Sequence, residues 1–193
     1  MQAYDPLDYE NLARSVVQAL LDGPDEPLPP HEVFEGSGVY AIYYHGDFSS
    51  YSPLVKSPDS RPIYVGKAVP TGARKGGRRV LRGRELCQRL KEHSESIAQA
   101  ENLKLKDFTC RYLVVVPVWI TLAERFLVEH YQPVWNVAID GFGNHDPGAG
   151  RRAMKRPRWD ILHPGRPWAA KLTPQESFEE VLSRLDRFFK RED

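Results

Sequence analysis

Apolar positions along this chain follow two spacings, one typical of helices and the other of strands. Recurrence every three or four residues predicts four helices, over residues 8–21, 83–100, 121–131 and 174–189. Short runs of aromatic and β-branched residues predict three strands, GVYAIYY at 38–44, PIYV at 62–65 and FTCRYLVVV at 108–116. The order helix, hairpin, helix, strand, helix indicates a small α+β domain.

The segments between these elements are rich in loop-forming residues. Residues 23–36 contain many prolines and acids and predict a linker, and residues 45–61 predict a long hairpin connection. Residues 67–79 form a Gly- and Arg-rich loop. Residues 136–171, dominated by Gly, Pro, Trp and Arg, predict irregular structure. The chain length of 193 residues fits a single domain.

Composition places the chain among globular proteins that need no disulfides, with 41% hydrophobic and 27% charged residues. Its two cysteines, Cys87 and Cys110, cannot form a Cys-rich zinc site unaided, and reduced thiols are the simpler expectation. The first ten residues are acidic, unlike a signal peptide, and no run approaches the apolar length of a membrane span. We therefore expect a cytoplasmic protein.

Charge is segregated along the chain, although the net charge is only +1. Residues 1–35 hold eight acids and one arginine, whereas residues 67–91 hold nine basic residues and one acid. Residues 150–171 hold seven basic residues and one acid. This pattern is typical of a polyanion binder, the alternative being solvated loop and helix faces. The expected DNA-binding residues are Arg74, Lys75, Arg78, Arg79, Arg82, Arg151, Arg152, Arg156 and Arg158.

Two tripeptides and an ordered set of later residues carry a family resemblance. Gly38-Val39-Tyr40 and Tyr64-Val65-Gly66 are followed, in order, by Arg89, His93, Glu124 and Asn136. This order resembles the GIY-YIG nuclease superfamily over residues 36–137. The stretches GKAVPTG (66–72), GFGNHDPGAGRR (141–152) and WDILHPGR (159–166) are similar to type II restriction endonucleases of this fold that cut GC-rich palindromes of the CCGCGG kind.

The resemblance implies a fold, a substrate and partners. The fold is a small core with a three-stranded, mainly antiparallel sheet flanked by helices over residues 36–137. Residues 1–35 add an N-terminal helix and linker, and residues 138–193 add a DNA-contacting loop segment and a C-terminal helix. The implied activity is that of a site-specific deoxyribonuclease on double-stranded DNA, with Mg²⁺ or Mn²⁺ as cofactor. A palindromic site implies a homodimer, and a cognate DNA methyltransferase would protect the host DNA.

Arg89 and His93 are four residues apart, so both project from one face of the predicted helix. Phosphodiester hydrolysis needs a nucleophilic water, a proton acceptor and positive charge for the pentavalent phosphate. A guanidinium can bind two phosphate oxygens at once, which suits Arg89. A histidine can accept a proton near neutral pH, which suits His93. The alternatives are an ordinary exposed helix arginine and a structural histidine.

The resemblance assigns roles to two tyrosines and an asparagine. Tyr40 would lie beside the attacking water and relay its proton. Because an unperturbed phenol has a pKa of about 10, Tyr40 needs help from His93 or Lys67. Tyr64 would hydrogen-bond the phosphate or the water. Asn136 would steady the site by hydrogen bonds. The alternative is that Tyr40 and Tyr64 are ordinary strand residues, since only the motif singles them out.

Glu124 is the candidate metal ligand, because one carboxylate plus waters and phosphate oxygens is a normal way to hold Mg²⁺. Two alternatives stay open. Thr121-x-x-Glu124 also has the spacing of a helix capping box. Glu129 is the other carboxylate that could bind the metal.

Other motifs and functions are less well supported. The glycines at 72–77 lack P-loop spacing, and Phe142 stands where a calcium loop would carry Asp or Asn. His145 and His163 lie in irregular segments and are expected to be structural or DNA-contacting. Two alternative functions remain: a DNA- or RNA-binding module without catalysis, and a repair, recombination or homing nuclease on the same core. Cleavage of DNA in the presence of Mg²⁺ discriminates the first of these.

Overall fold

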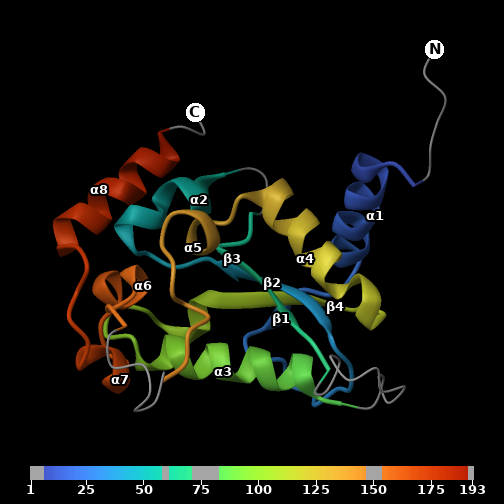
Figure 1. Ribbon diagram of the computed structural model, residues 1–193, viewed down its shortest axis with the longest axis horizontal. Helices are drawn as coiled ribbons and strands as arrows, with labels where there is room; N and C mark the ends of the chain where they lie inside the picture. The colour runs from blue at the N-terminus through green and yellow to red at the C-terminus, as the bar shows by residue number, and fades with distance from the viewer. Residues whose placement is uncertain (1–6, 58–60, 71–82, 147–153, 191–193) are drawn as a thin grey trace.

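A four-stranded antiparallel sheet forms the centre of the protein (Figure 1). The computed structural model describes residues 7–57, 61–70, 83–146 and 154–190. The strand order is β1-β4-β2-β3, and the strands are β1 (Glu26–Pro27), β2 (Gly38–Tyr44), β3 (Tyr64–Ala68) and β4 (Phe108–Val114). The α+β class and the antiparallel sheet are confirmed, and the sheet has one strand more than predicted.

The additional strand lies in the segment that we predicted to be a linker. Glu26 and Pro27 pair with Cys110 and Thr109 of β4, and the Tyr112 hydroxyl donates to Glu26 Oε1 at 3.0 Å. Two residues are too few to show the alternation of apolar and polar positions that predicts a strand. The pairing therefore depends on β4 and leaves no local pattern in the sequence.

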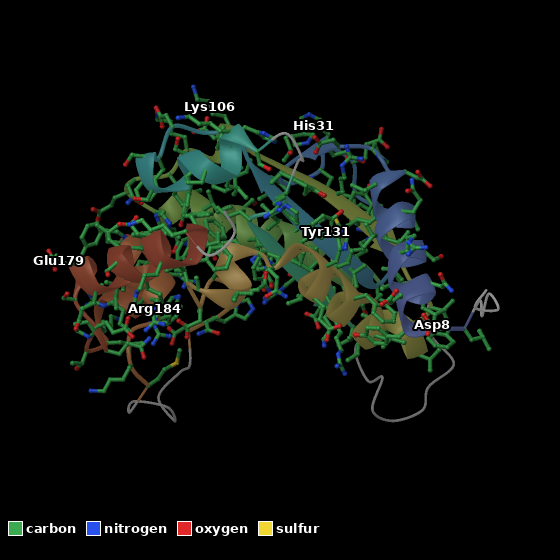
Figure 2. The ribbon with its side chains drawn as sticks, turned by 90° about the horizontal axis from the view of Figure 1, so that it is seen from above. Asp8, His31, Lys106, Tyr131, Glu179 and Arg184 are labelled. Carbon is green, nitrogen blue, oxygen red and sulfur yellow. The ribbon has the colours of Figure 1, made fainter. Side chains whose placement is uncertain are left out.

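Helices cover both faces of the sheet (Figure 1). Helix α3 (Glu85–Gln99) lies on one face, and α1 (Tyr9–Leu21) and α4 (Pro117–Tyr131) pack side by side on the other. The remaining helices are α2 (Ser52–Lys56), α5 (Val134–Val137), α6 (Arg158–Leu162), α7 (Pro167–Ala170) and α8 (Phe178–Phe189). Figure 2 shows α1, next to Asp8, and α8, with Glu179 and Arg184, at opposite ends of the molecule.

Helix α4 begins at Pro117, four residues before the predicted start. Proline is favoured at the first helical position, where its missing N–H costs nothing. Thr121 and Glu124 therefore lie inside the helix, and the interpretation of these two residues as a capping box is wrong. A capping box does occur at α8, where Ser177 and Glu180 bond reciprocally to each other's backbone N–H.

The segments predicted to be irregular contain short helices. Helix α2 interrupts the connection between β2 and β3, and α5, α6 and α7 lie within or next to residues 136–171. Each has four or five residues, which is too short for apolar periodicity to be recognised. Two of them carry proline in their first turn, which sequence analysis reads more readily as a loop signal.

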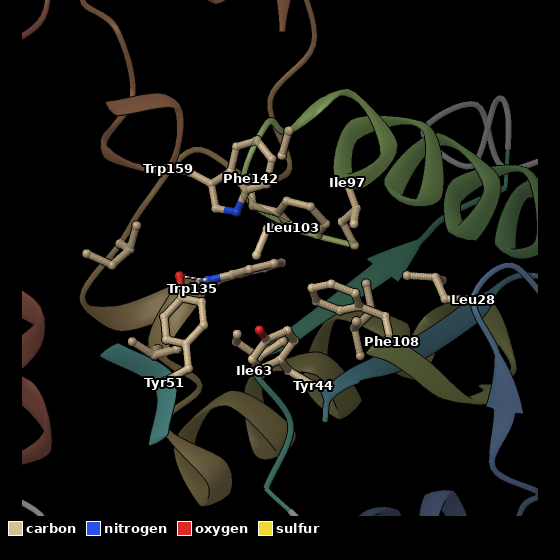
Figure 3. Close-up of a cluster of buried hydrophobic side chains, with 14 of the residues drawn as sticks. Leu28, Tyr44, Tyr51, Ile63, Ile97, Leu103, Phe108, Trp135, Phe142 and Trp159 are labelled. Atoms are coloured by element: carbon tan, nitrogen blue, oxygen red, sulfur yellow. Dashed lines mark hydrogen bonds between the residues drawn. The ribbon is translucent and has the colours of Figure 1, made fainter. Parts of the chain in front are cut away.

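All seven residues of β2 are buried, because helices pack against both faces of this strand. Tyr40, Ile42 and Tyr44 belong to the larger apolar cluster, on the side of α3. The alternate residues of β2 belong to the smaller cluster, with α1 and α4. Figure 3 shows Trp135 inside the larger cluster, where its indole N–H donates to the Tyr51 hydroxyl at 2.7 Å.

Among the residues that the structure describes, no helix combines the length and the apolar character required to cross a membrane.

Candidate active site

The Tyr40 ring lies across the edge strand β3 where that strand has no side chain. Tyr40 of β2 is paired with Gly66 of β3. A Cβ atom on Gly66 would come 2.5 Å from Cζ of Tyr40 and closer still to its oxygen. The two halves of the motif thus fit together physically, because only glycine at position 66 leaves room for the phenol of position 40.

Helix α3 brings His93 to this phenol. The Tyr40 hydroxyl and His93 Nε2 are 2.6 Å apart, and Tyr40 is 0% and His93 2% exposed. Burial raises the pKa of Tyr40 well above its ordinary value and lowers the pKa of His93 well below its own. Both groups are therefore neutral near pH 7, and one hydrogen bond joins the phenol oxygen to the imidazole nitrogen.

Arg89 lies one turn before His93 on the same face of α3, as the spacing predicted. Its Nη2 donates to Gly143 O at 2.8 Å, and its Nη1 donates to Glu92 at 2.9 Å and contacts His145. Burial lowers the pKa of Arg89, but Tyr40 and the hydrogen bond to Glu92 outweigh burial and raise it. Arg89 is therefore held in place at the site and is not an ordinary exposed helix arginine.

A turn at residues 141–144, within the segment predicted to contact DNA, covers this cluster. Phe142 stacks on His93, with ring centroids 4.6 Å apart, and meets Tyr64 edge-on at 4.9 Å. A Cβ atom on Gly143 would lie 2.7 Å from the Tyr64 hydroxyl. In the sequence, the string GFGN belongs to a stretch that carries the family resemblance, but no spacing connects it to His93 or Tyr64.

Lys67 and Glu124 form an ion pair on the other side of β3, with Nζ and Oε2 separated by 2.6 Å. Lys67 shares its face of the strand with Val65, which packs with α4. Burial is the main cause of the raised pKa values of Tyr40 and Tyr64, and the charge of Glu124 raises both further. The charge of Glu124 therefore acts on Tyr40 and Tyr64, although Glu124 lies on the other side of β3.

Glu129 is directed elsewhere. Its carboxylate accepts hydrogen bonds from Arg125 and Tyr9, at the junction of α4 and α1. Among the described residues no group of three His, Cys, Asp or Glu side chains could hold a metal ion. Glu124 alone, with a side chain 26% exposed, fits a Mg²⁺ ion whose other ligands are waters and phosphate oxygens. Lys67 would have to release the Glu124 carboxylate before Glu124 could bind such an ion.

Asn136 holds the outer side of β3. Its Oδ1 accepts from Val65 N at 2.9 Å, and its Nδ2 donates to Val65 O at 2.8 Å. The side-chain amide thus pairs with the strand as the backbone of a neighbouring strand would. This geometry supports the steadying role that we predicted for Asn136.

The predicted DNA-binding residues fall into two groups. Seven of them lie outside the described residues: Arg74, Lys75, Arg78, Arg79, Arg82, Arg151 and Arg152. Arg156 donates to the carbonyls of Ala169 and Ala170, and Arg158 is bonded to Glu176 and Asp140. DNA contact by these two remains a prediction, and any such contact would compete with their present partners.

The cluster has an exposed side and a buried side. The side chains of Arg89, Lys67 and Glu124 are 21%, 33% and 26% exposed, so an approaching anion meets them first. The Tyr40–His93 pair lies behind them and is closed to solvent. Such an arrangement can bind a phosphate with the exposed groups and move a proton along the buried pair.

Comparison with known proteins identifies the family. The chain matches the family model described as the Eco29kI GIY-YIG domain over residues 32–189, and no curated protein matches it. The match covers most of the chain and includes every motif residue discussed above. The chain therefore belongs to the Eco29kI GIY-YIG domain family and is a nuclease of the restriction endonuclease type, with DNA as its substrate.

Proposed function

We propose that this protein is a Mg²⁺-dependent type II restriction endonuclease that hydrolyses both strands of a GC-rich palindromic site in double-stranded DNA. The observation that carries the mechanism is the 2.6 Å contact between the Tyr40 hydroxyl and His93 Nε2, next to Arg89. It supplies a proton path at the point where the motif residues meet.

The proton path uses the neutral His93 tautomer whose Nε2 carries no proton and accepts from the Tyr40 hydroxyl. The attacking water gives a proton to the Tyr40 oxygen while the phenol proton passes to His93 Nε2, so that no free phenolate has to form. The water oxygen bonds to phosphorus, and the bond from phosphorus to the 3′ oxygen breaks. The 3′ oxygen takes a proton from solvent, which leaves 5′-phosphate and 3′-hydroxyl ends.

The exposed groups hold the phosphate. Arg89 can present two N–H groups to the nonbridging oxygens, and Tyr64 can donate a hydrogen bond to the phosphate or to the water. When bound to Glu124, Mg²⁺ would supply positive charge that stabilises the pentavalent phosphate. Lys67 would move from Glu124 to the phosphate as the ion binds.

Specificity and assembly follow from the basic segments and from the expected symmetry of the site. Arginines read guanine edges with two hydrogen bonds, so a GC-rich site requires several of them. A two-fold symmetric site fits a homodimer in which each subunit cuts one strand. A cognate methyltransferase would protect the host DNA.

Cleavage of plasmid DNA with Mg²⁺ and with EDTA tests the proposal. The wild-type protein should cut only with Mg²⁺, and Glu124→Ala should bind DNA without cutting. Glu129→Ala is the matched control, because it removes a carboxylate of the same helix that lies outside the site, and it should cut normally. Run-off sequencing of the products would then reveal the cut site. Binding without cutting by the wild-type protein under every condition would refute the proposal and favour a non-catalytic DNA-binding module.

A further inference from the structure

Arg166 is a buried arginine outside the motif, and each of its five N–H groups has an acceptor. Its side chain is 1% exposed and lies between α6 and α7. Nε and Nη2 donate to the two carboxylate oxygens of Asp160 at 2.6 and 2.5 Å. The remaining three N–H groups donate to the carbonyls of Gly141, Phe142 and Asn144 at 3.0 to 3.1 Å.

These three carbonyls belong to the turn that covers the candidate active site. Asn144 N donates to Gly141 O at 3.1 Å, and Gly141 has a φ of 101°, so the turn has a defined backbone conformation. Its two central residues contact the motif residues, Phe142 through the His93 ring and Gly143 through the Arg89 guanidinium. Arg166 therefore binds Phe142 directly and binds both chain neighbours of Gly143, so it is linked to His93 and to Arg89 through this turn.

Stability alone is a weak reason for such an arrangement. Burying a charged pair costs desolvation free energy that its mutual attraction often fails to recover. Stacking of the guanidinium over Trp159 and Trp168, at 4.6 and 4.7 Å, could be provided equally well by an apolar side chain. A guanidinium held by a carboxylate is distinctive in that it fixes three carbonyls of one turn at once.

We propose that Arg166, held by Asp160, is a positioning residue for catalysis. It fixes the 141–144 turn so that Gly143 orients Arg89 and Phe142, stacked on the His93 ring, holds that ring against Tyr40. This inference rests on the proposed nuclease function. The bonds from Arg166 to Asp160 and to the turn are called the Arg166 clamp. The proposal predicts that loss of the Arg166 clamp lowers the rate of the chemical step. DNA binding should be preserved, because Arg89 and Lys67 keep their charges.

Arg166→Lys is the first test, since lysine keeps the charge but has only three N–H donors. The single-turnover cleavage rate should fall by about 10- to 100-fold, as expected when reacting groups are displaced by about 1 Å. The Kd for DNA should stay within about threefold, a change of less than 1 kcal/mol. A rate equal to that of the wild type in the folded variant would overturn the proposal.

A second measurement does not depend on cleavage. The His93 imidazole is titrated by NMR, where loss of the Phe142 cover should raise its pKa toward the ordinary value. Tyr40, Tyr64, Arg89, His145 and Arg166 surround this ring, and the lysine variant keeps the charges of all of them. An unchanged His93 titration would count against the clamp. A shifted titration in a protein that never cleaves DNA would support the clamp and refute the proposed function.

Two further variants control for folding. Arg111→Lys is the matched control, because Arg111 also binds backbone carbonyls, those of Leu21 and Gly23 at the end of α1, and contacts neither the 141–144 turn nor the Tyr40–His93 pair in any interaction of the described residues. It should lower stability without changing the cleavage rate. If Arg166→Lys does not fold, the double variant Asp160→Leu/Arg166→Met removes both buried charges together. That variant should fold and cleave slowly, and wild-type cleavage by it would overturn the proposal.

Discussion

Gly66→Ala tests whether the position of the Tyr40 ring controls the cleavage rate independently of the stability of the fold. The added Cβ would lie 2.5 Å from Cζ of Tyr40, whereas ordinary contact begins near 3.4 Å. The Tyr40 ring must therefore withdraw by about 1 Å, and displacements of this size cost about 100-fold in rate. The overpacking should also cost about 1–3 kcal/mol in the free energy of unfolding.

Gly46→Ala offers a closely matched control. A Cβ on Gly46 would come 2.6 Å from Cζ of Tyr44, a buried tyrosine on the same face of β2 as Tyr40 but one that no proposed step uses. Single-turnover cleavage of a cognate duplex and urea unfolding should be measured for both variants. Both should lose stability, and only Gly66→Ala should lose about 100-fold in rate. Equal rate losses, or a Gly66→Ala protein that cuts at the wild-type rate, would refute the reasoning.

Three further predictions concern the proton path, acid stability and DNA binding. Tyr40→Phe should cut DNA about 100- to 10,000-fold more slowly than the wild type, which is the usual range for general acid–base catalysis. Its DNA binding should be preserved in a gel-shift assay. A cleavage rate within about tenfold of the wild type would exclude the proton relay. Burial lowers the pKa of His163 to about 3, so the stability due to its neutral form is complete above pH 6.5 and is lost as the pH falls toward 3. Urea unfolding between pH 7 and 5 should show a loss of up to about 1.4 kcal/mol per pH unit from this residue, and His163→Gln should reduce the slope. The logarithm of the DNA-binding constant should fall with the logarithm of salt concentration by about 0.9 per neutralised phosphate, and a flat response would contradict the role of the basic segments.

The elements that the sequence predicted well are those whose pattern is local. The seven-residue run of β2 was predicted with its observed bounds, because aromatic and β-branched residues are continuous there. The predicted 83–100 helix contains α3, whose apolar residues Leu86, Leu90 and Ile97 are all fully buried. The juxtaposition of Arg89 and His93 followed from helical geometry alone.

The features that were missed depend on contacts between distant segments. The turn at 141–144 lies about fifty residues from His93 in sequence, so no spacing rule connects Phe142 to that ring. Arg166 was counted in a basic stretch assigned to a polyanion, although its side chain is almost completely buried. Charge counted along a sequence cannot distinguish a guanidinium that faces solvent from one that binds carbonyls within the fold.

The position of β3 at the edge of the sheet accounts for the arrangement of the site. Tyr40 and Arg89 approach this strand from the α3 side, whereas Glu124 approaches from the α4 side. Groups on opposite faces of a sheet can act on one phosphate only around a free edge, and within the described part of the chain β3 pairs with β2 alone. A free edge also invites pairing with another strand, which would separate the two sets of groups. Asn136 occupies both backbone polar groups of Val65 and so blocks that pairing at this residue.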